Sequence, residues 1–356
     1  MPLVSVIIPH SGGSEILGEC LGSLADTRGI DLQVIIVDNA AVSDIADDAV
    51  RAFKDAQILR YECKIGFAAA CNRGVEAAGG EYVFLLNNDA TVEPTAIRTL
   101  ADRLTANPAA AACQPKILSL TRPGRFDYSS AAGGELDRFG YPFARGRVFD
   151  TLEEDRGQYD DEREVFWGAG AALMIRRELY LAAGGLEETF FAHMEEIDLL
   201  WRLQLMGFRV LAVPEAVVHH RGAATISGGS FLKQYLNHRN SLATLFRNYG
   251  IWSLVRYLPV RAVLDQVLML FALLRGDFKC FWAVVRAGCW FWRSLPYLIR
   301  CRRRIQGLRR IPDRIILNRL YPRSVAWDYF IRKRRTWSEL ESIWKNHRTR
   351  ADRSST

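Results

Sequence analysis

Apolar runs of strand length alternate with stretches of helical spacing over the first hundred residues. Four runs have the length and composition of buried strands: residues 4–8, 32–37, 58–62 and 82–86. Apolar positions recur at helical spacing in residues 14–24, 68–78 and 94–104. Pro9 stops the first run, and Ser14 is a candidate N-cap for the first helix. This alternation predicts an α/β fold with a mainly parallel, Rossmann-like sheet and helices on both faces.

The pattern changes in the middle of the chain and then returns. Residues 120–165 are rich in Gly, Pro and charged side chains, which indicates a loop-rich insertion long enough to act as a lid. Regular structure resumes with a strand over 171–175, a helix over 195–206 and a strand over 210–213. We therefore expect one catalytic domain over residues 1–225, with the insertion inside it.

Long aromatic helices punctuated by charges follow this domain. Residues 258–274 are apolar but contain Arg261 and Asp265, and charges also interrupt 280–299. Neither stretch supplies the uninterrupted run of about 20 apolar residues that crosses a bilayer. Apolar faces followed by an arginine cluster predict membrane-associating helices over 226–310, lying in an anionic leaflet. The alternative is that these helices pack on the first domain or on a second copy.

The net charge of +7 conceals an asymmetry between the two parts of the chain. Residues 1–220 carry 20 basic and 33 acidic side chains, a net −13, and residues 221–356 carry 27 and 7, a net +20. The basic part is expected to meet a polyanion, either a lipid surface or a nucleic acid. Residues 311–356 are expected to form a basic C-terminal tail that is mobile from Asn346 onward.

Cysteine usage and the first residues indicate the compartment. The seven cysteines are odd in number and include no C-x-x-C pair, so neither a disulfide framework nor a zinc site is predicted. A reducing compartment fits this pattern. The first apolar run follows Met1 without a basic segment, so no signal peptide is predicted and we expect the protein to stay in the cytosol.

Asn87, Asn88 and Asp89 are the first group of residues able to carry chemistry. They follow a predicted apolar strand, at the sheet edge where ligands of such folds bind. Mg²⁺ takes oxygen ligands and often needs only one or two carboxylates when substrate phosphates supply the rest. A simple turn explains the same three residues, because Asn and Asp are common in turns.

Two further groups stand before and after the last predicted strand. Glu195, Glu196 and Asp198 open a helix behind two phenylalanines, and a carboxylate desolvated there is a candidate general base. The helix dipole also explains acids in a first turn. His219 and His220 are adjacent on an extended segment, so their side chains point to opposite faces and one of them can face a site. A packed core histidine is the alternative for either.

Six motifs occur in a fixed order along residues 3–225. They are VSVIIP (4–9), IIVDN (35–39), GFAAACNRG (66–74), LLNND (85–89), GGL (184–186) followed by FF (190–191) and EEIDL (195–199), and PEAVVHH (214–220). Together they resemble family 2 glycosyltransferases with the GT-A fold, especially bacterial rhamnosyltransferase-like members that act on surface polysaccharides. The C-terminal helices look like those of membrane-associated members.

The resemblance implies a role for each matching residue. The implied donor-binding residues are Pro9, Asp38, Asn39, Asn72, Asn87, Asn88 and Asp89. Asp89 and His220 would hold a divalent metal, Mg²⁺ or Mn²⁺. Glu196 stands where the family has its catalytic base, commonly an aspartate. Because Glu196 is one methylene longer, Glu195 stays in reserve.

The reaction that the resemblance implies is an inverting, metal-dependent transfer. Its donor would be a UDP- or dTDP-sugar, rhamnose included, and its acceptor a saccharide or lipid-linked glycan, as in the synthesis of O-antigen or another surface polysaccharide. The enzyme would be peripheral on the cytoplasmic face of the inner membrane, against anionic lipid. No nucleic acid partner is expected, because the aromatic residues lie in apolar runs that favour lipid.

Other classes fit less well. No G-x-G-x-x-G follows the first predicted strand, and the chain lacks a G-x-x-x-x-G-K-[ST] loop and a G-x-S-x-G motif. A dinucleotide oxidoreductase, a P-loop enzyme and a serine hydrolase are therefore disfavoured. The remaining alternative is a catalytically inactive GT-A-like protein that serves as a membrane or nucleic-acid binding module.

Overall fold

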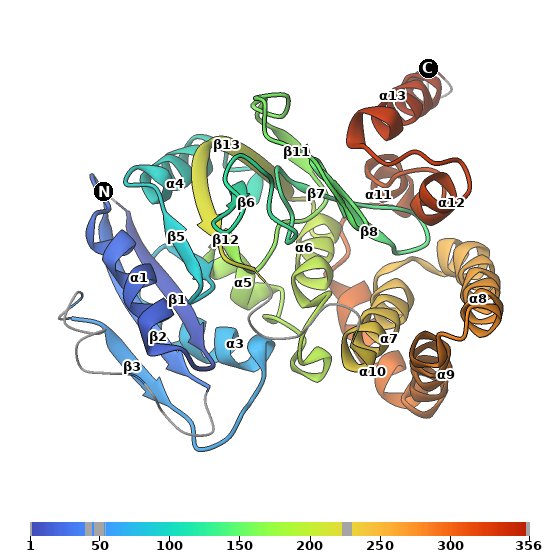
Figure 1. Ribbon diagram of the computed structural model, residues 1–356, viewed down its shortest axis with the longest axis horizontal. Coiled ribbons are helices and arrows are strands. Elements are labelled where there is room, and N and C mark those ends of the chain that lie inside the picture. Colours follow the sequence, from blue (N-terminus) through green and yellow to red (C-terminus); the bar gives the residue numbers. More distant parts are fainter. Residues whose placement is uncertain (1, 40–44, 46–52, 54, 223–229, 354–356) are drawn as a thin grey trace.

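The computed structural model describes residues 2–39, 45, 53, 55–222 and 230–353, with side chains up to residue 345. Within these residues the centre is a mixed sheet of nine strands (Figure 1). They are β1 (Leu3–His10), β2 (Asp31–Asp38), β3 (Gln57–Arg60), β4 (Tyr82–Leu86), β5 (Ala90–Val92), β6 (Ala110–Ser119), β11 (Arg163–Val165), β12 (Ala172–Arg176) and β13 (Arg209–His220). The order is β11-β13-β6-β12-β4-β1-β2-β3, with β5 paired to β13.

The part of the sheet from β3 to β4 is parallel, as predicted. β1 pairs in parallel with β2 and β4, and β2 with β3. Side chains are buried along all of β4 and from Val4 onward in β1. A sheet covered on both faces buries both sets of side chains, which is why these strands are continuous apolar runs. β12 runs antiparallel between β4 and β6, and β6 is again parallel to β13.

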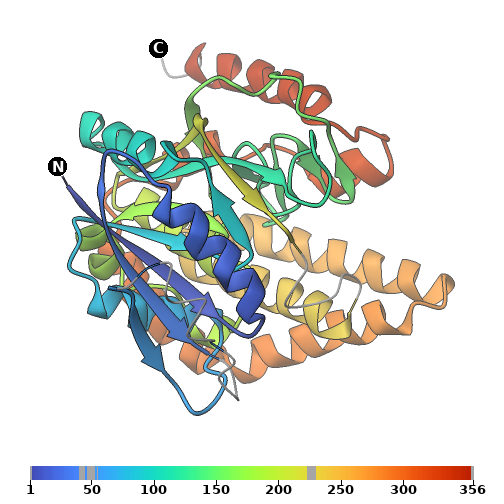
Figure 2. The ribbon, with the colours of Figure 1, turned by 60° about the vertical axis from the view of Figure 1, so that its left-hand side comes forward.

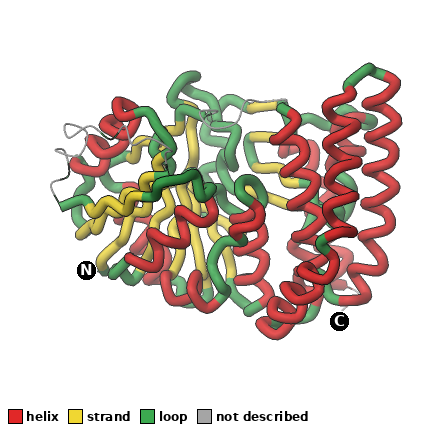
Figure 3. Tube along the Cα trace, turned by 90° about the horizontal axis from the view of Figure 1, so that it is seen from below, coloured by secondary structure: helices red, strands yellow, loops and turns green. Residues whose placement is uncertain are grey.

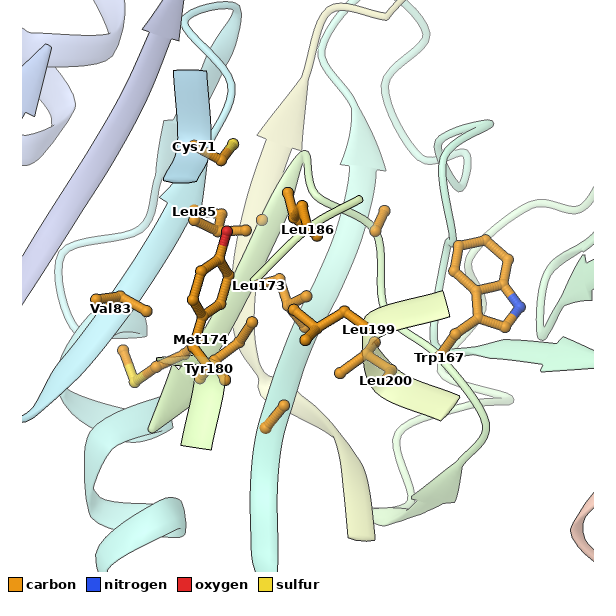
Figure 4. Close-up of a cluster of buried hydrophobic side chains, with 14 of the residues drawn as sticks. Cys71, Val83, Leu85, Trp167, Leu173, Met174, Tyr180, Leu186, Leu199 and Leu200 are labelled. Carbon is orange, nitrogen blue, oxygen red and sulfur yellow. The ribbon is translucent and has the colours of Figure 1, made fainter. Parts of the chain in front are cut away.

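Helices cover both faces of the sheet (Figures 1 and 2). Those of the first 220 residues are α1 (Ser14–Ala25), α3 (Phe67–Ala77), α4 (Ala96–Ala106), α5 (Arg177–Ala182) and α6 (Glu195–Leu205), with the short 3₁₀ helix η1 (Glu188–Phe190). Figure 4 shows Cys71 of α3, Leu85 of β4, Leu173 of β12 and Leu199 of α6 in one buried cluster. The same core thus joins the sheet to α3 and α6.

The local predictions agree with the structure except at some boundaries. α1 begins at Ser14 itself, and the N-cap is Gly13, whose φ of 90° lies in the left-handed region. The predicted Ser14 cap is therefore wrong, because glycine turns the chain there without the Cβ penalty. Gly207, with φ of 100°, follows the end of α6. β5, β6 and α5 were not predicted from the sequence.

The insertion over residues 120–165 contains a second, smaller sheet. Its antiparallel order is β10-β9-β8-β7, formed by β7 (Gly134–Leu136), β8 (Pro142–Ala144), β9 (Arg147–Val148) and β10 (Thr151–Leu152). A separate apolar core joins this sheet to the end of the chain, with Phe143 packed against Trp337 at 5.8 Å between ring centroids. The insertion, which we expected to be able to act as a lid, is thus anchored on a core of its own.

The segment of residues 311–353 is folded, whereas we expected a basic C-terminal tail over 311–356 that is mobile from Asn346 onward. It forms α11 (Asp313–Arg319), α12 (Val325–Phe330) and α13 (Trp337–Arg353). Its apolar side chains complete the core of the insertion, and they include Tyr321, Val325, Trp337, Leu340 and Trp344. Asn346 and the residues up to Arg353 continue α13. Aromatic residues spaced far apart in a basic sequence gave no helical stripe long enough to reveal this packing.

Four long helices lie between the catalytic body and this end segment. They are α7 (Phe231–Asn248), α8 (Ile251–Leu274), α9 (Phe278–Arg293) and α10 (Leu295–Leu308). α7 packs against α6, α9 and α10, and α8 against α9. Figures 2 and 3 show α8 and α9 as a pair at one side of the molecule. The stretch 280–299, expected to form one segment, is divided between α9 and α10, because Pro296 starts a new helix.

One helix in the described part of the chain, α8, is long and apolar enough to cross a membrane by length and composition. It begins at Ile251, earlier than the predicted 258, and reaches 24 residues. Arg261 and Asp265 still interrupt its apolar run, as we expected for residues 258–274. Two of its charged side chains are buried together, since Arg261 Nε lies 3.1 Å from Asp265 Oδ1.

Candidate active site

The carboxyl ends of β1 and β2 bring the predicted nucleoside-binding residues together. Pro9 and His10 end β1, and His10 lies opposite Asp38 in the parallel register. Asn39 donates its backbone N–H to the carbonyl oxygen of His10 at 2.7 Å, and its Oδ1 accepts from the N–H of Ile65 at 2.7 Å. Asp38 and Asn39 are both buried. These residues thus form one wall at the edge of the sheet.

Asn87, Asn88 and Asp89 form the turn between β4 and β5, next to that wall. The side-chain nitrogen of Asn88 lies 3.1 Å from Nδ1 of His10 and donates to the carbonyl oxygen of Gly12 at 3.2 Å. The turn reading of this motif is therefore correct, and it does not exclude chemistry. Asn88 fixes the turn to the end of β1, which leaves Asn87 and Asp89 directed toward β13.

His220 lies between two buried carboxylates. Its Nε2 is 3.0 Å from Asp89 Oδ1, and its Nδ1 is 2.9 Å from Asp127 Oδ1. The neighbouring His219 points to the other face of β13, where its Nε2 is 3.1 Å from Glu93 Oε1. The prediction that only one of the two histidines faces the site agrees with this geometry. β13 pairs with β5, and this pairing brings His220 beside the Asp89 turn.

The two carboxylates control the charge of His220. Burial disfavours the charged ring, but hydrogen bonds and attraction from Asp127 and Asp89 outweigh it and raise the pKa of His220 to about 10. Burial likewise disfavours the charged form of Asp127, and the hydrogen bonds from His220 and Ser129 prevail and lower its pKa. In the protein alone the ring of His220 is therefore an imidazolium beside the carboxylate of Asp127.

Asp89 and His220 fit a hard divalent cation. Two adjacent ligands of an octahedral ion at about 2.1 Å lie about 3.0 Å apart, which is the separation of Asp89 Oδ1 and His220 Nε2. The amide of Asn87 lies 3.1 Å from the same ring nitrogen. Within the residues that the structure describes, no group of three or more His, Cys, Asp or Glu side chains gathers as a metal cage. An ion here would take its other ligands from water and phosphate.

Glu195 and Glu196 lie at the start of α6 with unsatisfied oxygens. The Oε2 atoms of both are buried and have no hydrogen-bond partner. Burial, followed by repulsion from Glu196, raises the pKa of Glu195 well above its ordinary value. Burial also raises the pKa of Glu196 to about 7, although backbone N–H groups partly oppose the shift. A carboxyl group with this pKa exchanges a proton near neutral pH, as a general base must.

A short glycine-containing segment joins the two parts of the site. The backbone N–H of Gly170 hydrogen-bonds Glu196, and the carbonyl oxygen of Ala171 accepts from the N–H of Asn87 at 3.0 Å. A Cβ at Gly170 would lie 2.8 Å from Cζ of Phe67, so glycine is required where this segment passes α3. Because Gly170 and Ala171 are consecutive, this segment links the side chain of Glu196 to the turn after β4.

Asn72 differs from the donor-binding role that we expected. Its side-chain nitrogen donates to Leu186 O at 2.9 Å and to Glu188 Oε1 at 3.1 Å. Its Oδ1 accepts from Tyr180 Oη at 2.6 Å and from the N–H of Leu186 at 2.9 Å. These four bonds use the full capacity of the amide. The side chain therefore holds the segment before α6 and has no hydrogen-bonding capacity left for a nucleotide.

Sequence reasoning missed several residues that shape the site. Asp127 comes from the insertion, where an isolated acid in a polar segment carries no motif. Arg239 and Asn240 come from α7, which we expected to face a membrane. A basic-polar pair within a helix of mixed pattern gave no signal of contact with the loop before α6. His10, at the end of β1, was not among the predicted site residues.

A cavity of about 390 Å³ lies elsewhere, between α8 and α11. Its lining includes Arg138, Trp252, Arg256, Asp313 and Arg314. None of the predicted site residues contributes to it. The candidate chemistry therefore belongs to the edge of the sheet and not to this cavity.

Comparison with known proteins agrees with this arrangement. Residues 5–180 match the model of glycosyl transferase family 2. N-acetylglucosaminyl-diphospho-decaprenol L-rhamnosyltransferase of Mycobacterium tuberculosis is 28% identical over 240 residues, which cover 63% of this chain and 77% of that protein. O-antigen biosynthesis protein RfbC of Myxococcus xanthus is 25% identical over 228 residues, 63% of this chain and 18% of that protein.

Solved structures share the fold at low sequence identity. GalNAc-T7, crystallised with UDP, GalNAc and Mn²⁺, gives a TM-score of 0.54 at 14% identity over 69% of this chain and 48% of that one. A mannosyltransferase of Pyrobaculum calidifontis, with GDP-Man and Mn²⁺, gives 0.50 at 17% identity over 81% and 86%. The predicted GT-A fold is thereby confirmed. The chain is a glycosyltransferase that belongs to family 2.

Proposed function

We propose that this glycosyltransferase moves a sugar from a UDP- or dTDP-sugar to a lipid-linked saccharide, with inversion at the anomeric carbon. Rhamnose is the first sugar to test, and a surface polysaccharide such as O-antigen is the proposed product. The names of the relatives support this choice, since one is a rhamnosyltransferase that acts on a diphospho-decaprenol sugar and another an O-antigen biosynthesis protein.

The observation that carries the proposal is the pairing of two kinds of groups at one edge of the sheet. Asp89 Oδ1 and His220 Nε2, the proposed cation ligands, lie 3.0 Å apart. Glu196 supplies a buried carboxyl oxygen without a partner. Transfer from a nucleotide sugar needs both, because charge grows on the leaving diphosphate while the acceptor hydroxyl loses a proton.

Each residue then has one task. Pro9, Asp38 and Asn39 line the nucleoside position, and the Asn87–Asp89 turn faces the diphosphate. A divalent cation held by Asp89 and His220 would stabilise the negative charge of the leaving group as a Lewis acid. Glu196 takes the proton of the acceptor hydroxyl as that oxygen attacks the anomeric carbon from the side opposite the diphosphate, so a single displacement inverts the configuration.

Glu196 is the better base of the two neighbouring acids. Its side chain is partly exposed, whereas Glu195 is 4% exposed. The protonated Glu195 beside it keeps a second negative charge away from the site. Glu195 therefore acts as a neutral neighbour and Glu196 as the proton acceptor.

A donor and acceptor screen tests the function directly. The purified full chain is incubated with UDP- and dTDP-sugars, Mg²⁺ or Mn²⁺, and a short-chain prenyl-diphospho-N-acetylglucosamine. We expect nucleoside diphosphate release and a product one sugar heavier, with inverted configuration by NMR. Asp89→Asn and EDTA should each abolish transfer. Full transfer under EDTA would contradict the metal role, and retained configuration would contradict the single displacement.

The exposed face of α8 supports a peripheral membrane location. Its outward apolar side chains follow helical spacing, at Val260, Val263, Val267, Leu270, Phe271 and Leu274. Its other face is fixed to the body, where Arg261 donates to Phe139 O at 2.8 Å and to Ser241 Oγ at 2.7 Å. A helix bound to protein along one face and apolar along the other suits the plane of a leaflet. We place the enzyme on the cytoplasmic face of an anionic inner membrane.

Exposed basic side chains in the same part of the chain add to the proposal. In α8, α9, α10 and the residues just after α8 and α10 they are Arg256, Arg275, Lys279, Arg286, Arg293, Arg300, Arg303, Arg304 and Arg310. Each is expected to contribute on the order of 1 kcal/mol near an anionic leaflet. A lipid-linked acceptor would be presented at the same surface, which is why membrane contact and acceptor use belong to one proposal.

A further inference from the structure

The loop just before Glu195 holds an unusual backbone conformation. Phe191, His193 and Met194 have φ values of 63°, 68° and 73°, all in the left-handed region. Residues other than glycine rarely adopt this conformation, because Cβ crowds the backbone. Three such residues within four positions persist only where the surroundings hold them. The loop therefore has a restraint outside its own sequence.

Helix α7 supplies that restraint through one amide. The side-chain nitrogen of Asn240 lies 3.1 Å from Phe190 O, 2.9 Å from Ala192 O and 2.7 Å from His193 O. Asn240 is fully buried, and Arg239 Nε donates to its Oδ1 at 2.8 Å, which orients the amide. All three acceptors are main-chain oxygens of the left-handed loop or its first neighbour.

Arg239 adds two bonds to the same loop. Its Nη2 donates to Thr189 O at 2.7 Å and to Phe190 O at 2.9 Å. Its guanidinium lies over the ring of Trp290 in α9, 5.0 Å from the centroid. The loop is thus held from the side of the C-terminal helices by two consecutive residues of α7.

The opposite side of the loop contacts α3. Phe191 O accepts from the N–H of Phe67 at 3.1 Å. A Cβ at Gly66 would lie 2.9 Å from Cδ2 of Phe191, so glycine lets the phenylalanine ring approach the start of α3. The loop is therefore held between α3 and α7, and it cannot relax toward either without breaking contacts.

α7 also forms ion pairs with residues before and after the loop. Arg247 Nη1 lies 2.6 Å from Glu187 Oε2, before the loop, and Nη2 lies 2.9 Å from Asp198 Oδ2, after it. The side chains of Arg247 and Asp198 are fully buried. Asp198 donates its backbone N–H to Met194 O at 2.9 Å. The first turn of α6, which carries Glu196, is therefore fixed to a backbone that α7 defines.

We propose that Asn240 is a positioning residue of the transfer reaction, because its amide fixes the loop Phe191–Met194 and thereby the direction of Glu196. The proposal rests on the proposed role of Glu196 as the base. It extends that role, since it makes a helix outside the matched family segment a working part of the active site. Asn240 touches neither reacting group and acts only through the loop.

A change in this loop should affect kcat more than it affects the stability of the fold. A displacement of about 1 Å at a catalytic group costs on the order of 100-fold in rate. We expect Asn240→Ala and Asn240→Ser each to lower kcat about 30- to 100-fold and to change the donor KM less than 3-fold. Asn240→Asp keeps the size but places a carboxylate against three carbonyl oxygens, so it should be at least as impaired.

The pH profile separates a positioning role from a loss of folded protein. Glu196 is faced by Glu195 on its own helix, by the Cys71 thiol of α3, which burial keeps neutral, and by the N–H of Gly170. When the loop opens and water enters, the acid limb of the kcat profile should move from near pH 7 toward the ordinary glutamate range. A variant that merely unfolds in part keeps the original limb at reduced amplitude.

Two substitutions on the same helix serve as matched controls. Ser241→Ala removes a buried hydroxyl that donates to Gly140 O at 2.8 Å, away from the loop. Thr244→Val alters a buried side chain one turn after Asn240 whose hydroxyl has no hydrogen-bond partner. Both should keep kcat within 2-fold and keep the acid limb, even where Ser241→Ala lowers the melting temperature as much as Asn240→Ser does.

Hydrogen exchange tests the loop without any substrate. In the full-length protein, amides of residues 192–196 should exchange at least 10-fold faster in Asn240→Ser than in wild type or Ser241→Ala. Unchanged exchange, with kcat and the acid limb as in wild type, would overturn the proposal. If Glu196→Gln retains full transfer, the base assignment fails instead, and the exchange result still decides whether Asn240 holds the loop.

Discussion

His220 depends on Asp127 for its orientation. Asp127 Oδ1 holds Nδ1 at 2.9 Å, which turns Nε2 toward Asp89. Histidines that bind metal commonly have such a partner on the other ring nitrogen, and its loss costs about 10- to 100-fold in metal affinity. We therefore expect Asp127→Asn to weaken Mn²⁺ binding by that factor, measured by calorimetry in the presence of nucleoside diphosphate.

A matched control for Asp127→Asn is Glu93→Gln on the other face of β13. Glu93 lies 3.1 Å from His219, which points away from the site, so its loss should leave Mn²⁺ affinity unchanged. Equal affinity in Asp127→Asn and wild type would show that His220 needs no support.

Substitution by glutamine should have different effects on kcat at Glu196 and at Glu195. Glu196→Gln removes the proposed proton acceptor and should lower kcat by about 100- to 10,000-fold, the usual contribution of a general base. Glu195→Gln replaces a neutral acid with a neutral amide of the same shape and should retain transfer within about 10-fold. Steady-state kinetics with the screened donor measure both. The reverse ranking would move the role of base to Glu195.

The pH dependence of Glu196 has opposite signs for rate and stability. The base must be ionised, so kcat should rise through about pH 7. Burial raises the pKa of Glu196 above its ordinary 4.5, so the folded state keeps an extra proton between these values. The resulting stability is complete below pH 4.5 and is lost as the pH rises through 7.

Glu196→Gln should therefore raise the melting temperature by several degrees at pH 8 and by little at pH 5. Differential scanning calorimetry at the two pH values measures the shift, with the exposed Glu188→Gln as the control. An equal shift at both pH values would mean that the Glu196 carboxyl is not strained by its burial.

Among the elements, α8 carries the proposed membrane contact. Val263 and Val267 are 56% and 57% exposed on its outer face. Val263→Glu with Val267→Glu should reduce flotation with anionic vesicles at least 10-fold, because charged side chains disfavour insertion. Leu181→Glu on α5, a position of 43% exposure in the catalytic body, should leave flotation unchanged. Vesicle binding that survives the double substitution would contradict the assignment to α8.

Secondary-structure elements are predicted well where one segment carries a complete apolar pattern. They are predicted poorly where two segments distant in the chain share a core. The buried strands β1, β2 and β4 were found because continuous apolar runs identify them. The pairing of Phe143 with Trp337 was not, since neither segment has an apolar stripe that is complete alone. Asp127 and Asn240 were missed for the same reason, because their partners are distant in the chain.

Motifs located more of the site than periodicity did. The Asn87–Asp89 turn, Glu196 and His220 all lie at the carboxyl edge of the sheet or beside it, and their individual roles stay predictions. Asn72 shows the limit of assigning a role from a matching position in a motif. It occurs in a matching motif, yet its side-chain amide is hydrogen-bonded to Tyr180, Leu186 and Glu188. A motif fixes a residue type and place, but the hydrogen-bond partners decide the use.

In the whole molecule, some of the positive charge of the second part is used internally. Arg247 pairs across the two parts with Glu187 and Asp198. Arg261 pairs with Asp265 and Arg309 with Asp313 at 2.6 Å, both within the second part. The pairing of Arg247 thus attaches α7 to the acidic body. Only the exposed remainder is available to a membrane.

The second core should matter for stability as a unit. Trp337 is 1% exposed among Phe143 and Trp344. Removing a large buried aromatic side chain costs about 3–5 kcal/mol. We expect Trp337→Ala to lower the free energy of unfolding by that amount in urea titrations, and Trp327→Ala, 51% exposed on α12, to change it by less than about 0.5 kcal/mol. Similar losses in both would mean that the end segment contributes no separate core.

The bonds from Asn240 to the loop before α6 also set an order for making the enzyme. Nascent chains fold from the N-terminus as they leave the ribosome. Glu196 emerges before Asn240, so the sheet and its proposed cation site can form while the loop before the proposed base still lacks its support. An unfinished chain would then bind a nucleotide sugar without transferring its sugar. Transfer would begin only when synthesis has passed α7.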